Sequence, residues 1–195
     1  MNIVNEIKIS ALATIVLGSV CCGLYPVVVW GMGQVLFNRQ ANGSLVYGQD
    51  GKVIGSELIG QNFNGSTYFN PRPSAAGTAG YDPTSSGGSN LGPTQKAFID
   101  SVKQRVADYR KANGLSETQL VPADAVTASA SGLDPHISVK NALLQLPRVA
   151  KERKISEDDV RKVVDQYTDK PDFGIFGESR VNVLMVNLAL DGKLK

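Results

Sequence analysis

The stretch from Ile9 to Asn38 contains no charged side chain, although 19% of the whole chain is charged. A bilayer core about 30 Å thick is spanned by roughly 20 helical residues, and Ile9–Trp30 provides that length. A cleaved signal peptide is the alternative, but its apolar region usually has about 7–15 residues, and no small-residue cleavage site follows this run. We therefore predict an N-terminal segment, residues 1–38, with an uncleaved transmembrane helix at about residues 9–33.

Small residues recur at every fourth position of this run: Ser10, Thr14, Gly18 and Cys22. Residues four apart share one face of a helix, and small side chains allow another membrane helix to approach closely. The pattern favours a packing face for a partner helix, and a lone anchor is the alternative because glycine is common in membrane helices. The flanking basic residues, Lys8 and Arg39, balance each other, so charge does not predict the orientation.

Residues 39–195 predict a single soluble domain of the α+β class. Short apolar runs on either side of Asp50-Gly51 indicate a β-hairpin. Apolar periodicity predicts a helix over 94–113 that ends at Gly114, a helix over 138–153 interrupted by Pro147, and a helix capped by Ser156. The C-terminal run from Arg180 fits both a strand and a helix. Both cysteines lie in the apolar run, so this domain needs no disulfide.

A long segment, 62–93, is rich in Gly, Pro, Ser, Asn and Thr, and Arg72 and Asp82 are its only charged residues. Loops of this length are either disordered or functional. Four aromatic residues are spaced along it: Phe63, Tyr68, Phe69 and Tyr81. Because free linkers seldom contain such residues, we predict an ordered surface loop that contacts a partner protein.

Most chemical motifs are absent from the sequence. The chain has one histidine, and its two cysteines lie in the apolar run, so we predict no metal site. Gly48–Lys52 lacks the spacing of a phosphate-binding loop, and a net charge of +2 argues against nucleic acid as a partner. A basic run between Arg148 and Lys162 is offset by acidic neighbours, which favours a solvated surface. We predict no catalytic residue and assign no cofactor-binding residue.

One short stretch, 126–136, concentrates the remaining polar groups: Thr127, Ser129, Ser131, Asp134 and the single histidine, His136, with Gly132 among them. A Ser/His hydrolase normally brings its residues together from separate segments, so this spacing favours a structural loop. Asp134 is placed to cap the amide of His136, and Pro135 suits the first position of a helix. Contact with a partner or ligand remains the main alternative, followed by a membrane-tethered hydrolase using Ser131 and His136.

Several longer segments follow one another in a distinctive order: GSELIGQNF at 55–63, YFNPRPSA at 68–75, GSNLGPT at 88–94, VTASASGLDPHIS at 126–138, QLPRVAKER at 145–153 and RVNVLMVNLALD at 180–191. Together with the N-terminal apolar run, they cover nearly the whole chain. In this order they resemble the C subunit of the bacterial Kdp-type potassium-transporting ATPase.

This resemblance implies a single-pass protein of the bacterial inner (plasma) membrane whose soluble domain is extracytoplasmic. The implied partners are a channel-like potassium-translocating subunit and a P-type ATPase subunit, with a further small membrane subunit left open, besides membrane lipid. The implied role is that of an accessory, non-phosphorylated subunit that stabilises the assembly. The alternative is a catalytic chaperone that raises the ATP affinity of the ATPase subunit through a transient complex, with ATP reached through that subunit.

Overall fold

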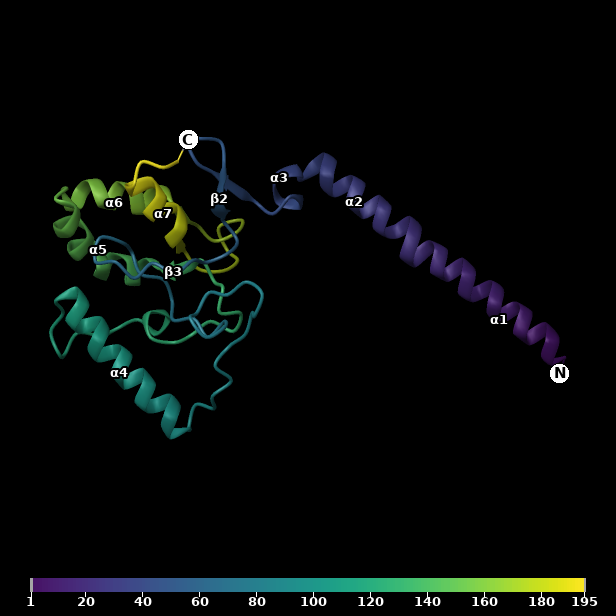
Figure 1. Ribbon diagram of the computed structural model, residues 1–195, viewed down its shortest axis with the longest axis horizontal. Coiled ribbons are helices and arrows are strands. Elements are labelled where there is room, and N and C mark those ends of the chain that lie inside the picture. Colours follow the sequence, from purple (N-terminus) through teal and green to yellow (C-terminus); the bar gives the residue numbers. More distant parts are fainter. Residues whose placement is uncertain (1, 195) are drawn as a thin grey trace. The chain divides into compact units, whose positions relative to one another are not determined.

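The computed structural model describes residues 2–194, and the chain divides into two compact units, with the boundary in the sequence between Leu45 and Val46 (Figure 1). The first unit contains a continuous helix of 34 residues, Ile3–Leu36, whose most apolar window has a mean hydropathy of 2.1. None of that window is buried inside protein. Its length and composition are sufficient for a membrane span.

Three segments make up this helix: α1 (Ile3–Gly18), a π-helical turn (Ser19–Leu24) and α2 (Tyr25–Leu36). Pro26 lies in the first turn of α2, where its missing N–H is tolerated. The wider π turn directly before it lets the helix continue past the proline. A short helix, α3 (Asn38–Ala41), follows.

The second unit begins with the predicted hairpin, which is confirmed. Strands β1 (Leu45–Tyr47) and β2 (Val53–Ser56) pair with each other, and Gly51 takes a positive φ in the turn between them. The three predicted helices also form, as α4 (Lys96–Asn113), α5 (Val139–Arg153) and α6 (Glu157–Gln166). As predicted, α4 ends at a left-handed Gly114, and the Ser156 side chain caps α6.

The predicted interruption at Pro147 is wrong, because α5 runs through it. A proline inside a helix costs about 3 kcal/mol. Helix α5 nevertheless buries Leu146, Val149 and Ala150 around it, and each fully buried aliphatic side chain contributes roughly 1.5–3 kcal/mol. Packing of this face therefore outweighs the local penalty.

A three-stranded antiparallel sheet joins distant parts of the chain in the order β3-β5-β4. Its strands are β3 (His136–Ser138), β4 (Thr168–Asp169) and β5 (Arg180–Asn182). The ambiguous C-terminal run therefore holds both predicted structures, since α7 (Val183–Leu190) follows β5 directly. Pro135, which suits a first helical position, does not begin a helix, because the next three residues are extended and pair with β5. Helix α5 begins at Val139, next to the predicted start at 138.

The main hydrophobic core lies between α5, α6, β5 and α7, and α4 contacts α5 (Figure 1). Its fully buried large residues include Phe69, Ile137, Leu146, Val160, Val164 and Val186. Phe69 belongs to the long loop 62–93, so this loop is ordered, as predicted, and contributes to the core. Its aromatic side chains turn toward their own domain, so they give no support to the predicted contact with a partner, which stays a prediction.

Candidate functional site

The loop of residues 126–136 ties down its own backbone through the short polar side chains, as predicted. The Thr127 hydroxyl donates to the Ala123 carbonyl at 2.7 Å, next to the short 3₁₀ turn Ala123–Ala125. The oxygens of Ser129 and Ser131 accept from the amides of Gly132 and Leu133, at 2.9 and 3.1 Å. These side chain–backbone hydrogen bonds take the place of the backbone–backbone hydrogen bonds that a helix or sheet would provide.

The same loop is joined to the long loop 62–93 and its entry by backbone contacts. The amides of Gly60 and Gly87 donate to the carbonyls of Leu133 and Ser131, at 2.8 and 2.9 Å. Gly132 has a φ of +68°, and a Cβ there would lie 2.7 Å from the Ala76 Cβ. The two loops form one packed unit, and Gly132 is required by both its backbone conformation and the close approach.

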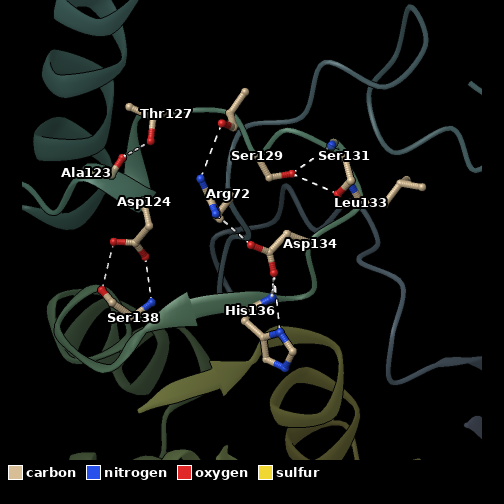
Figure 2. Close-up of polar contacts among 12 residues, drawn as sticks. Arg72, Ala123, Asp124, Thr127, Ser129, Ser131, Leu133, Asp134, His136 and Ser138 are labelled. Atoms are coloured by element: carbon tan, nitrogen blue, oxygen red, sulfur yellow. Dashed lines mark hydrogen bonds and ion pairs between the residues drawn. The ribbon is translucent and has the colours of Figure 1, made fainter. Parts of the chain in front are cut away.

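Arg72 of the long loop lies inside the curve of loop 126–136, as Figure 2 shows. Its Nη1 donates to Asp134 Oδ2 at 2.8 Å, and its Nη2 lies 3.5 Å from the Ala128 carbonyl. Its Nε is buried without a hydrogen-bond partner among the described residues. The second Asp134 oxygen accepts from the His136 amide at 2.9 Å, which confirms the predicted cap.

The charges around Asp134 keep it ionised. Burial would raise the pKa of its carboxyl, but hydrogen bonds from His136 and Arg72, with the Arg72 charge, outweigh burial and lower the pKa to about 2. The His136 ring lies between two carboxylates, with Nδ1 3.5 Å from Asp134 Oδ1 and Nε2 3.4 Å from Asp169 Oδ2. Arg180 Nε approaches the same Asp169 oxygen at 3.5 Å. His136 therefore connects the loop to β4 and β5.

An open cavity of about 520 Å³ lies against this cluster. Its polar lining includes Arg72, Thr127, Asp134, His136, Ser138 and Arg180, together with Asp124 and Glu178. The size lies within the range of small-molecule sites, about 300–1,000 Å³. The lining mixes both charge signs, and Asp124 already binds Ser138 and Asn141. The cavity offers hydrogen bonds to a polar group without selecting one class of ligand.

The hydrolase interpretation finds no support in this geometry. Within residues 2–194, the Ser131 oxygen contacts the Leu133 amide and lies 3.5 Å from the Ser129 oxygen. The His136 ring is directed instead at Asp134 and Asp169. A serine nucleophile needs a base within hydrogen-bond reach, and the described contacts do not bring these two side chains together.

A second polar cluster, which the sequence did not reveal, holds the long loop onto α5. Gln145 is buried, accepts from the Asn70 amide at 2.7 Å and donates to the Asn70 carbonyl at 3.1 Å. Arg148 donates to the side chains of Asn70 and Asn113 at 2.9 Å, and to the Ser66 carbonyl. Burial lowers the pKa of this guanidinium. The interpretation of the basic run as solvated surface is therefore wrong for Arg148.

Arg153 and Asn187 complete this attachment. The Arg153 guanidinium donates to the Thr67 carbonyl at 2.6 Å, pairs with Asp191 at 2.9 Å and lies over the Tyr68 ring at 4.9 Å. Arg153 is thus a second member of the basic run that binds inside the domain. The fully buried Asn187 amide accepts from the Phe69 N–H at 2.8 Å and donates to the Phe69 carbonyl at 2.9 Å. No sequence pattern predicts these side chain–backbone pairs.

The predicted packing face lies on the apolar helix, with Ser10, Thr14 and Gly18 in α1 and Cys22 in the π turn. The Thr14 hydroxyl donates to the Ser10 carbonyl at 2.8 Å, which satisfies a polar group without a partner helix. Apart from its chain neighbours and the backbone of its own helix, a Cβ at Gly18 would meet no described atom within 4 Å. The packing role of this face stays a prediction.

Comparison with known proteins gives one consistent result. The family "KdpC: K+-transporting ATPase, c chain" matches residues 7–192. The "Potassium-transporting ATPase KdpC subunit" of Mycobacterium tuberculosis (strain ATCC 25618 / H37Rv) is 52% identical over 182 residues, which are 93% of this chain and 95% of that protein. The subunit of the same name from Geobacter metallireducens is 49% identical over 96% of this chain and 97% of its own length. The match includes the apolar helix and the domain together.

Proposed function

This chain belongs to the KdpC family, the c chains of K+-transporting ATPases, and on that premise we propose that it is the accessory subunit that stabilises an ATP-driven potassium uptake complex. The observation that carries the proposal is the match over residues 7–192, which spans both structural units. The partners are a channel-like potassium-translocating subunit and an ATP-hydrolysing subunit. A further small membrane subunit is left open.

The helix Ile3–Leu36 anchors the subunit in the bacterial plasma membrane, and the domain lies outside the cytoplasm. The length and hydropathy of the helix support the anchor, and the side of the membrane rests on the resemblance of the sequence to the family. The packing face Ser10, Thr14, Gly18 and Cys22 supplies the contact with a helix of another subunit, because small residues allow close packing in lipid. Within the domain, loop 126–136 and its cavity present the surface that meets the channel-like subunit.

The side of the membrane is tested by thiol labelling, because the native cysteines Cys21 and Cys22 both lie within the helix. Leu120, 72% exposed on the domain, is replaced by cysteine in a Cys21→Ala, Cys22→Ala background. A maleimide that does not cross membranes should label this residue in intact spheroplasts. Labelling that appears only after lysis would place the domain in the cytoplasm.

The alternative role, a chaperone that raises the ATP affinity of the ATPase subunit, is favoured by one observation. The cavity beside His136 is large enough for a small ligand, and its lining includes Arg72 and Arg180 beside the acidic Asp124, Asp134 and Glu178. Titration of labelled ATP onto the full-length chain tests this role, with Arg180→Gln as the variant that removes one cationic side chain. Saturable binding that weakens in the variant would favour the chaperone role, and no binding at millimolar ATP would exclude a nucleotide site on this chain by itself.

A further inference from the structure

A turn between β4 and β5 presents three large apolar side chains to solvent. Phe173, Ile175 and Phe176 are 94%, 79% and 66% exposed. Exposed apolar residues are ordinary when they are scattered singly, but here they are gathered within four positions. Larger exposed apolar clusters mark sites of contact with proteins or membranes.

This turn has a defined backbone. The amides of Asp172 and Phe176 each donate to the carbonyl of the other residue, at 2.8 and 2.9 Å, and the Gly174 amide donates to the Pro171 carbonyl at 2.9 Å. Phe173 takes a φ of +52°, which is uncommon for a bulky side chain. The apolar side chains are therefore displayed on a closed turn, and no hydrophobic core of the described residues includes them.

The covalent chain limits how far this turn can move from a membrane. Helix α2 ends at Leu36 and the domain begins at Val46. At most about 3.6 Å per residue, the connecting segment 37–45 spans no more than about 32 Å. A domain of this size has a radius of gyration of about 15 Å. A globular domain with this radius of gyration is about 40 Å across. The connecting segment is therefore shorter than the domain, which stays next to the bilayer that holds the helix.

We propose that the turn formed by Asp172–Phe176 is a second, shallow membrane contact, in which Phe173, Ile175 and Phe176 enter the interfacial region of the bilayer that holds the helix. The apolar face of an interfacial amphipathic helix penetrates roughly 5–10 Å into the boundary of headgroups and acyl chains, and we expect the side chains of this turn to occupy the same region. The inference rests on the membrane anchor proposed above. Its effect is to fix the orientation of the domain on the membrane surface.

Because the domain is tethered to the bilayer by the helix, three apolar side chains are enough for a populated membrane contact. The connecting segment 37–45 is short and contains the helix α3. A short connection gives the domain a high effective concentration at the bilayer, so a weak interaction that would fail for a free domain is populated here. Five charged residues flank the turn: the acidic Asp169, Asp172 and Glu178 and the basic Lys170 and Arg180. Because they carry no excess of positive charge, the contact is expected with neutral lipid and does not depend on anionic lipid.

Tryptophan quenching by brominated lipid tests the proposal in the full-length chain, reconstituted alone in phosphatidylcholine vesicles. Trp30 is the only native tryptophan and lies in α2, so the wild-type chain reports on the anchor. In a Trp30→Phe background, Phe173→Trp reports on the turn and Phe176→Trp is a second reporter. Leu120→Trp is the matched control, because Leu120 is also an exposed apolar residue of the domain.

We expect bromines placed close to the headgroups to quench the tryptophans at 173 and 176 at least threefold more strongly than the tryptophan at 120. Bromines placed deep in the acyl chains should quench them less. Equal quenching at 173 and 120 overturns the membrane contact. A second result would also overturn the membrane contact: neither turn reporter is quenched in vesicles, and the emission of both shifts to the blue only when the other subunits are added. That result would identify a contact with protein. If Trp30 of the wild-type chain is quenched neither by shallow nor by deep bromines, the membrane anchor itself is refuted.

Discussion

Asn187 is one of the buried side chains that attach the long loop to the domain, and replacing it with leucine tests its contribution. Asn187→Leu keeps the γ-branched shape but removes both hydrogen bonds to the Phe69 backbone, at 2.8 and 2.9 Å. Phe69 and Asn187 are both 0% exposed, so water does not replace these bonds. A buried polar group left unpaired costs about 1–3 kcal/mol. For two groups, the expected loss is about 2–6 kcal/mol.

Hydrogen exchange of the full-length chain in detergent measures this loss directly. A loss of about 4 kcal/mol corresponds to roughly a thousandfold faster exchange of the Phe69 amide, because each 1.4 kcal/mol is a factor of ten. Gln104→Leu is the matched control, since its exposed amide makes one bond, to Asp108, on the surface of α4. We expect a change below about 0.5 kcal/mol there. Less than tenfold acceleration in Asn187→Leu, or an equal effect in the control, would refute this role of Asn187.

Three further changes test other parts of the account. Gly132→Ala should destabilise the domain by about 2–5 kcal/mol in thermal unfolding, because it combines a left-handed φ with overlap on Ala76, whereas Gly87→Ala meets open space and should cost under about 1 kcal/mol; equal effects would count against the loop packing. The pKa of Asp134 is lowered to about 2, so the ionised carboxyl stabilises the fold above its unfolded pKa, and this stabilisation is lost as the pH falls through about 4 to 2. Asp134→Asn should therefore make the melting temperature depend less on pH over that interval. An unchanged slope of melting temperature against pH would contradict the Arg72 and His136 contacts. Gly18→Leu should reduce co-purification with the other subunits at least threefold, whereas Val16→Leu, on the opposite face of the helix, should not; equal yields would disprove the packing face.

Local signals in the sequence were sufficient for most elements. The charge-free run, the turn pair at Asp50-Gly51, the caps at Gly114 and Ser156, and the Asp134 cap each depend on neighbouring residues, and the structure confirms them. The sequence-based predictions failed where contacts between residues far apart in the chain determine the local structure. Strand β3 exists because β5 pairs with it, although Pro135 alone suggests a helix start. Helix α5 passes Pro147 because its face is buried by other elements.

The candidate site shows the same limit. The hydroxyls of Thr127, Ser129 and Ser131 bind backbone within a few residues, and their role followed from the sequence. Arg72 lies 62 positions from Asp134 along the chain, and Asn187 lies 118 positions from Phe69. Pairs so far apart leave no periodic or local pattern in a single sequence. The long loop was therefore recognised as ordered, but the side chains that order it were not.

The central claim is that this chain stabilises a potassium-transporting complex, and assembly in its presence and absence measures it most directly. The channel-like and ATP-hydrolysing subunits are expressed with the chain, without it, or with Asn187→Leu, and the complex is purified through a tag on the ATP-hydrolysing subunit. We expect a high yield of complex with potassium-stimulated ATP hydrolysis only with the wild-type chain, and a reduced yield with the variant. The same yield and activity without the chain would contradict the account.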